Sequence, residues 1–191
     1  MAFTEAFNKA VQHAMLYEVG GFWNENHPAV ARGLIDTPAN KKAVGYVNDP
    51  VDRGGETKFG VAKKANPTLN ITSLTWEQAK SVYFTKYWSA GKSDQLPDKI
   101  AIIHFDGCIN HGVSRANKFS QEALGVVADG VIVPKTIAAA NAVMKPEEIV
   151  QHIARLRRNY YEAIIRNDPT QAKYRNGWLR RINEVEAYAL K

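Results

Sequence analysis

The sequence has few of the residues that form cross-links or membrane anchors. Among 191 residues there is a single cysteine, Cys108, so no internal disulfide can form, which fits synthesis in a reducing cytoplasm. The apolar runs are much shorter than the roughly 20 residues that a membrane-spanning helix needs. The first residues, Met1-Ala2-Phe3-Thr4-Glu5, have no basic segment followed by an apolar one, so we expect no secretory signal.

Several sequence signatures are also missing. There is no His-Glu-x-x-His pattern, which excludes a zincin-type metalloprotease, and there is no internal repeat or low-complexity tract. What is present is an ordinary globular composition, with 45% hydrophobic and 23% charged residues. The chain is long enough to bury a sizeable core.

Positive charge is concentrated in one segment. Residues 150–181 hold eight basic and two acidic residues, so this segment alone accounts for the net charge of +6. A basic segment suits anionic partners, such as bacterial surface polymers, anionic lipid or nucleic acid. From composition alone, a solvated helix face rich in arginine is the simpler interpretation.

The apolar pattern is mainly helical. Apolar residues recur at helical spacing from about Thr4, a suitable N-cap, to Glu18. Residues 24–42 contain two prolines and a glycine, and we expect an irregular insertion with one helical turn around 29–34. The segment Thr75-Trp76-Glu77-Gln78 is close to a capping-box pattern. Further helices are expected over 97–111, 114–124, from Pro134, over 146–166 and near the C-terminus.

The most informative stretch is the loop from Gly45 to Gly60. It places two aspartates, a glutamate and a threonine among glycine and proline positions, and Phe59-Gly60 suggests a small hairpin. Upstream, a predicted helix ends with Glu18 before a glycine stop. An acid at this end of a helix opposes the helix dipole, and such conflicts are common at functional positions.

These residues resemble glycoside hydrolase family 108, a family of lysozyme-like muramidases found mostly as phage endolysins. Its pattern reads Glu-Gly-Gly and then Asn-Asp-Pro-x-Asp-x-Gly-Gly-x-Thr-x-x-Gly. The second motif matches from Asn48 through Gly60. The first is Glu18-Val19-Gly20-Gly21, with Val19 as an extra residue, and residues 22–44 separate the two motifs.

The second half of the chain resembles the peptidoglycan-binding region that accompanies the catalytic segment in that family. The matching segments include Asn110-His111-Gly112, Asp129-Gly130 and Asn176-Gly177-Trp178-Leu179. The resemblance implies a mainly α, lysozyme-like fold, one compact unit with two lobes and a small β-hairpin near the active site. We expect a catalytic muramidase lobe over 1–92, with 22–44 as an insertion, and a helical peptidoglycan-binding lobe over 93–191.

The resemblance also implies roles for individual residues. Glu18 is expected to protonate the leaving oxygen of a glycosidic bond, Asp52 to act as base or water holder, and Thr57 to orient the same water. A base that acts through water implies inversion at the anomeric carbon. Asp49 could exchange roles with Asp52, although an Asx-turn before Pro50 is the simpler interpretation of Asp49. Glu56 is expected to be a solvated loop acid.

The implied activity is hydrolysis of the bond between N-acetylmuramic acid and N-acetylglucosamine in peptidoglycan, for host cell lysis. The expected substrate-binding residues are Tyr46, Asn48, Asp49, Asn110 and Trp178, with no cofactor and no metal. The expected partners are peptidoglycan and, through the basic segment, the anionic outer-membrane surface. We expect a monomer that binds no nucleic acid, is made in the host cytoplasm and reaches the wall after the membrane is permeabilised.

Two alternatives come from the residues themselves. His104, Cys108 and His111 stand at i, i+4 and i+7, the spacing of a Cys–His nucleophile pair in a wall peptidase or amidase, or of three zinc ligands. Ile100 and Ile103 share that face, so a buried structural cluster is favoured. The second alternative is a non-enzymatic, basic nucleic-acid-binding module, but no helix-turn-helix or zinc-finger signature supports it.

Overall fold

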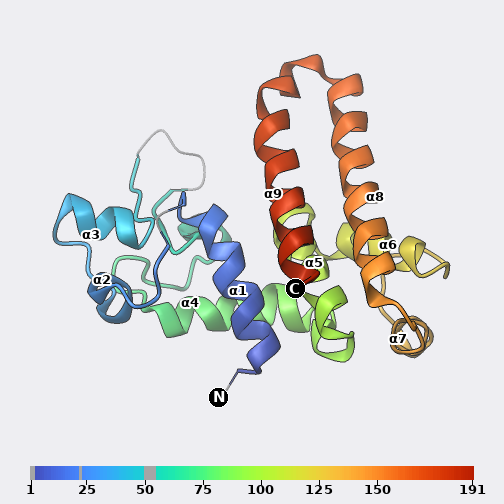
Figure 1. Ribbon diagram of the computed structural model, residues 1–191. Helices are drawn as coiled ribbons and strands as arrows, with labels where there is room; N and C mark the ends of the chain where they lie inside the picture. The colour runs from blue at the N-terminus through green and yellow to red at the C-terminus, as the bar shows by residue number, and fades with distance from the viewer. Residues whose placement is uncertain (1–2, 22, 50–54) are drawn as a thin grey trace. The chain divides into compact units, whose positions relative to one another are not determined.

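The computed structural model describes residues 3–21, 23–49 and 55–191, and it is mainly helical (Figure 1). The described residues also form one short antiparallel sheet of two strands. The chain divides into two units. The helical unit comprises Met1–Ala10 and Lys86–Lys191, and the hairpin unit comprises Val11–Thr85. The expected mainly α fold with a small β-hairpin is confirmed.

Helix α1 (Glu5–Glu18) begins and ends where the sequence predicts. The Thr4 hydroxyl accepts a hydrogen bond from the Phe7 amide at 3.2 Å, which caps the first turn. At the other end Gly20 and Gly21 have φ of 75° and 82°, and the Gly21 amide donates to the Leu16 carbonyl at 2.7 Å. This left-handed C-terminal cap stops the helix just after Glu18.

The insertion is more regular than the sequence suggested. It contains α2 (Pro28–Arg32), which is the helical turn expected around 29–34, and α3 (Pro38–Ala43), which the sequence analysis did not predict. In both helices the proline occupies the first turn, where its missing N–H costs nothing. The side chains of His27 and Thr37 cap the two N-termini.

The hairpin pairs β1 (Thr57–Lys58) with β2 (Val61–Ala62), with Thr57 opposite Ala62. Phe59 and Gly60 form the turn with φ of 52° and 72°, the left-handed geometry that a two-residue hairpin turn requires. Thr57 also pairs with Val47, so the loop before the hairpin joins the same small sheet. A short 3-10 helix, η1 (Lys63–Ala65), follows.

Helix α4 (Trp76–Tyr83) starts with the expected capping box, because Thr75 and Gln78 each bond the other's backbone amide. It continues into a π-helical segment, η2 (Phe84–Ser89). Trp76 and Tyr83 are buried, and the Trp76 ring packs against the buried Phe59 ring with centroids 5.6 Å apart. Thus α4 supports the hairpin turn.

The helical unit is built around α5 (Asp98–His111), most of which is buried. It packs against α6 (Val113–Ala123), α8 (Pro146–Asn167) and α9 (Arg175–Ala189), and α8 and α9 run side by side in opposite directions (Figure 1). Shorter elements are η3 (Ser93–Gln95), α7 (Pro134–Asn141) and η4 (Pro169–Tyr174). The helices expected from the sequence in this half are all present.

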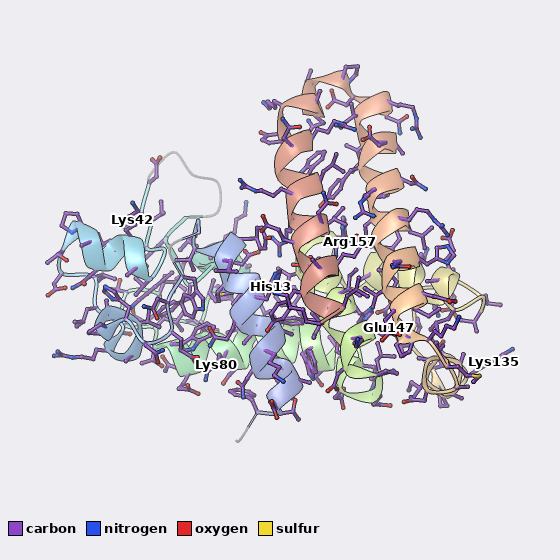
Figure 2. All side chains as sticks on the ribbon, in the orientation of Figure 1. His13, Lys42, Lys80, Lys135, Glu147 and Arg157 are labelled. Atoms are coloured by element: carbon purple, nitrogen blue, oxygen red, sulfur yellow. The ribbon has the colours of Figure 1, made fainter. Side chains whose placement is uncertain are left out.

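A buried ion cluster joins three of these helices. Asp106 of α5 accepts hydrogen bonds from Arg157 of α8 at 2.6 Å and from Arg181 of α9 at 2.9 Å (Arg157 is labelled in Figure 2). Burial alone would raise the pKa of Asp106, but the two guanidinium groups outweigh it and lower that pKa to about 2. The segment 150–181 is therefore not wholly a surface patch, since two of its arginines are internal. Among the described residues, no helix combines the length and apolarity needed to cross a bilayer.

Candidate functional site

The Glu18 side chain lies against the hairpin turn in the hairpin unit. A Cβ atom placed on Gly60 would lie 3.0 Å from the Cβ of Glu18 and 3.3 Å from its Oε2 atom. The same Cβ would overlap the hydroxyl of Tyr83, which donates a hydrogen bond to the Phe59 carbonyl at 3.0 Å. The half-buried acid at the end of α1 thus packs directly over a turn that only glycine can form without collision.

Thr57 lies on the same hairpin as the turn that Glu18 contacts. Only Lys58 and Phe59 lie between Thr57 and Gly60, so the Cα atoms of Thr57 and Gly60 are at most about 11 Å apart. The Thr57 hydroxyl donates to the Gly55 carbonyl at 3.2 Å, which leaves its oxygen lone pairs to accept a hydrogen bond from a water. Asp52, the expected base, lies outside the described residues, as does Pro50.

Glu56 is a half-exposed acid of this loop that also makes structural hydrogen bonds, which the sequence did not suggest. One of its carboxylate oxygens accepts hydrogen bonds from the Thr72 hydroxyl at 2.6 Å and from the Tyr46 hydroxyl at 2.8 Å. These two bonds, Thr72 first, lower the pKa of Glu56. The bond to Glu56, together with burial, raises the pKa of Tyr46. Tyr46 is thereby fixed beside Asn48, while Asn48 and Asp49 are exposed.

Lys58 anchors the hairpin from inside. Its side chain is fully buried, and its ammonium donates to the Gly33 carbonyl at 2.7 Å and the Thr72 carbonyl at 2.8 Å. Burial lowers the pKa of this lysine. One side chain therefore ties the end of α2 in the insertion, the strand β1 and the loop before α4 to one another. The insertion is part of the support of this site.

The two expected binding residues of the second half lie in the helical unit. Asn110 accepts a hydrogen bond from the Tyr161 hydroxyl, and the Trp178 ring stacks on the Tyr161 ring with centroids 4.4 Å apart and planes inclined by 12°. Both Asn110 and Trp178 are half-buried. The structure brings these two side chains together through Tyr161, a residue that the sequence did not single out as a link between them.

His104 and Cys108 form a buried structural pair. The His104 ring bonds the Gly91 carbonyl through Nε2 at 3.0 Å and the Ser120 hydroxyl through Nδ1 at 2.8 Å, and burial lowers its pKa to about 4. Burial raises the pKa of the Cys108 thiol to about 12, which leaves almost no thiolate at neutral pH. His111 faces a different partner, since its Nε2 accepts from Arg157 at 3.1 Å. This geometry favours structure over nucleophilic catalysis.

Comparison with known proteins agrees with the local geometry. Residues 41–112 match the family model Glycosyl hydrolase 108, and residues 115–183 match Predicted Peptidoglycan domain. The resemblance to family 108 with its peptidoglycan-binding region is therefore confirmed, and it supports a glycoside hydrolase that acts on peptidoglycan. Glu18 precedes the matched region, whereas Thr57 and Gly60 fall inside it.

A solved structure extends the similarity over most of the chain. The structure titled "Structure of Brucella abortus SagA" is 29% identical, with a TM-score of 0.62, and the match covers 76% of this chain and 85% of that one. The search of curated proteins found no match.

Sequence reasoning missed three side chains that shape the site. Tyr83 looked like one more apolar residue of a helix, and Lys58 like a surface lysine between two motif positions. Glu56 sat between the motif residues Gly55 and Thr57 and carried no signal of its own.

Proposed function

We propose that this protein hydrolyses the glycosidic bond between N-acetylmuramic acid and N-acetylglucosamine in bacterial peptidoglycan, as a lysozyme-type endolysin. Glu18 protonates the leaving oxygen. Asp52 and Thr57 hold the water that attacks the anomeric carbon, which gives inversion. Tyr46, Asn48 and Asp49 contact the glycan on the same loop. Residues 1–92 carry the chemistry, and residues 93–191 hold the wall polymer through contacts that include Asn110 and Trp178.

The observation that carries the proposal is the contact between Glu18 and Gly60. A carboxyl group at a helix end lies against the turn of a hairpin whose first strand begins with Thr57. An acid and a water-binding hydroxyl on one small, internally braced scaffold are what glycosidic hydrolysis requires. The braces are the Tyr83 hydroxyl, the buried Lys58 ammonium and the Glu56 bonds to Tyr46 and Thr72.

The biological role in this proposal is lysis of a bacterial host from within. The protein is made in the host cytoplasm and reaches the wall after a separate lesion in the membrane. It acts as a monomer. Exposed arginines of residues 150–181 support attachment to anionic surfaces, the outer membrane included, and this part of the proposal rests on Arg155, Arg166 and Arg180, which are exposed.

The chemical identity of the cleaved bond is tested by digesting purified peptidoglycan and analysing the fragments by mass spectrometry. A muramidase creates new reducing sugar ends with N-acetylmuramic acid at the cut. Borohydride reduction of the products should therefore add two hydrogens to each new end. Free amino groups in place of reducing ends would mean that a peptide or amide bond is cleaved, and would overturn the proposal.

A further inference from the structure

A surface cleft in the helical unit has no role in the chemistry proposed above. It has a volume of about 460 Å³ and lies where α5 ends and α6 begins. Its wall includes His111, Ser114, Arg115, Lys118 and Tyr160. All of these residues belong to the helical unit, and a cleft of this size suits a small ligand or a short segment of a polymer.

The cleft is cationic. Arg115 and Lys118 line it, and no aspartate or glutamate does. Within the described part of the chain neither cation makes an ion pair. Asp129, in the turn beside the cleft, accepts hydrogen bonds from Gln121 at 2.8 Å and from the Val131 amide at 2.9 Å, and its charge also interacts with that of Lys118. Two cations in a concave site that no carboxylate lines favour an anionic ligand.

The guanidinium of Arg115 is held in a defined place. It lies 4.9 Å from the centroid of the Tyr160 ring, within the range of a cation–π contact. The Tyr160 ring is itself packed edge-on against the rings of His111 and Phe119, with centroids 5.6 Å away in each case. A guanidinium that rests on an aromatic face keeps its edge for a planar, bidentate partner, the geometry that suits a carboxylate.

His111 adds a neutral donor to the cleft wall. Its Nε2 accepts from the Arg157 guanidinium, which can only donate, so the hydrogen of the neutral ring must be on Nδ1. Burial, reinforced by the charge of Arg157, lowers the pKa of His111 to about 3, which keeps the ring neutral. The buried ion cluster of α5, α8 and α9 thus fixes the tautomer of a residue in the cleft.

The rim of the cleft is braced by the Asp129-Gly130 turn. A Cβ placed on Gly130, where φ is 89°, would lie 2.6 Å from the Ser114 hydroxyl and 3.2 Å from Cε of Lys118. The turn therefore packs closely on both residues, and glycine is required for that approach. The Asn117 side chain also stabilises this turn, because it donates a hydrogen bond to the Gly130 carbonyl at 2.9 Å. The cleft is a preformed feature of the fold.

We propose that this cleft binds a free carboxylate on the peptide of peptidoglycan, with Arg115 and Lys118 as its charged ligands. The inference rests on the proposed function, since it takes the wall polymer as partner. Arg115, Lys118 and Tyr160 all lie in the region that matches Predicted Peptidoglycan domain. The sugar backbone offers mainly neutral hydroxyl and amide groups, whereas the attached peptides carry carboxylates, so a cationic cleft selects the peptide.

The test measures binding of a soluble muropeptide, a disaccharide that carries a tetrapeptide, by isothermal titration calorimetry with the full-length chain. We expect Arg115→Gln/Lys118→Gln to weaken binding about 10- to 100-fold, as the loss of charge-assisted hydrogen bonds predicts. The matched control Lys135→Gln/Lys191→Gln removes the same charge from exposed positions outside the cleft, and should bind like the wild type (Lys135 is labelled in Figure 2).

The ligand side of the test needs no variant. The same muropeptide with its carboxylates converted to amides should lose a similar factor in affinity. The disaccharide without peptide, with its lactyl carboxylate also converted to an amide, should bind as weakly. Equal binding by the cleft variant and the wild type, or by the amidated and free-acid ligands, overturns the inference. Binding of a phosphate-containing teichoic polymer, without binding of the muropeptide, also overturns the inference.

The outcomes separate this inference from the proposed function. Muropeptide binding that depends on Arg115 and Lys118, in a protein that creates no reducing ends, would refute the muramidase and keep the cleft. Release of reducing ends without carboxylate-dependent binding would keep the muramidase and refute the cleft.

Discussion

The substitution Gly60→Ala tests whether the hairpin turn positions Glu18. Two effects add to its cost. The φ of 72° disfavours any residue with a Cβ by about 1–2 kcal/mol. The new methyl group would also overlap the Tyr83 hydroxyl and crowd Glu18 Cβ at 3.0 Å. Tyr83 is only 3% exposed, so its ring cannot swing away, and overpacking of this kind costs about 1–3 kcal/mol.

The expected total for Gly60→Ala is therefore about 2–5 kcal/mol of unfolding free energy, measured by urea titration. Gly20→Ala is the matched control for backbone strain. Gly20 has φ of 75° and no atom within 4 Å of its would-be Cβ, so this variant should show the strain alone. Adding Tyr83→Phe to Gly60→Ala removes the overlapping hydroxyl and should recover about 1 kcal/mol in a double-mutant cycle.

The rate of peptidoglycan cleavage by Gly60→Ala should fall because Glu18 is displaced. If the methyl group pushes Glu18 by about 1 Å, turnover of peptidoglycan should drop about 100-fold in protein that is still folded at the assay temperature. A turbidity assay on purified walls measures it. The reasoning is refuted if Gly60→Ala costs no more stability than Gly20→Ala and clears walls at the wild-type rate.

The remaining predictions concern charged residues. Asp106→Asn should destabilise the helical unit by about 3–5 kcal/mol, because two buried arginines lose their carboxylate partner. Thermal unfolding measures this loss, with the variant of an exposed acid, Asp94→Asn, as the control. The folded pKa of Asp106, about 2, is below its ordinary value of 3.8, so its contribution is complete above pH 3.8 and should be lost as pH falls toward 2 in urea titrations. Glu56→Ala should release Tyr46 and raise the KM for wall fragments, whereas Glu56→Gln, which keeps an acceptor oxygen, should not; equal effects would contradict the role given to the two hydroxyl bonds. Neutralising Arg155, Arg166 and Arg180 together should reduce the amount of protein pulled down with intact walls at low salt. The variant and the wild type should attach equally near 1 M salt, where the Debye length is about 3 Å. Equal attachment of the two proteins at every salt concentration would refute the attachment role.

The local signals in the sequence were sufficient for most helices. Thr4 and the Thr75 capping box marked two helix starts, and the glycines after Glu18 and His111 marked two ends, because caps satisfy backbone groups within a few residues. Helix α3 in the insertion was missed for an equally local reason. Pro38 was interpreted as a sign of irregular structure, yet proline suits the first turn of a helix, as it does at Pro28 in α2.

The site itself depends on contacts between residues far apart in the sequence. The motif indicated Glu18 and Thr57, but no pattern could show that the Tyr83 hydroxyl bonds Phe59, 24 residues earlier. Nor could one show that Lys58 bonds Gly33, 25 residues earlier. The burial of Arg157 did leave a sequence signal. It lies on the same helical stripe as Val150, Ile153 and Tyr161, so its position on the apolar face pointed inward. Its partner Asp106, 51 residues earlier, is fixed only by the packing of α5 on α8.

The central claim is that Glu18 supplies the proton for cleavage of the glycan. It is tested most directly by comparing the rate at which wild type, Glu18→Gln and Glu5→Gln release reducing ends from purified peptidoglycan. Glu5 is an exposed acid at the other end of the same helix, so its substitution controls for charge on α1. The account predicts a loss of about 10²–10⁴-fold for folded Glu18→Gln and a wild-type rate for Glu5→Gln. A folded Glu18→Gln variant that releases reducing ends at the wild-type rate would contradict it.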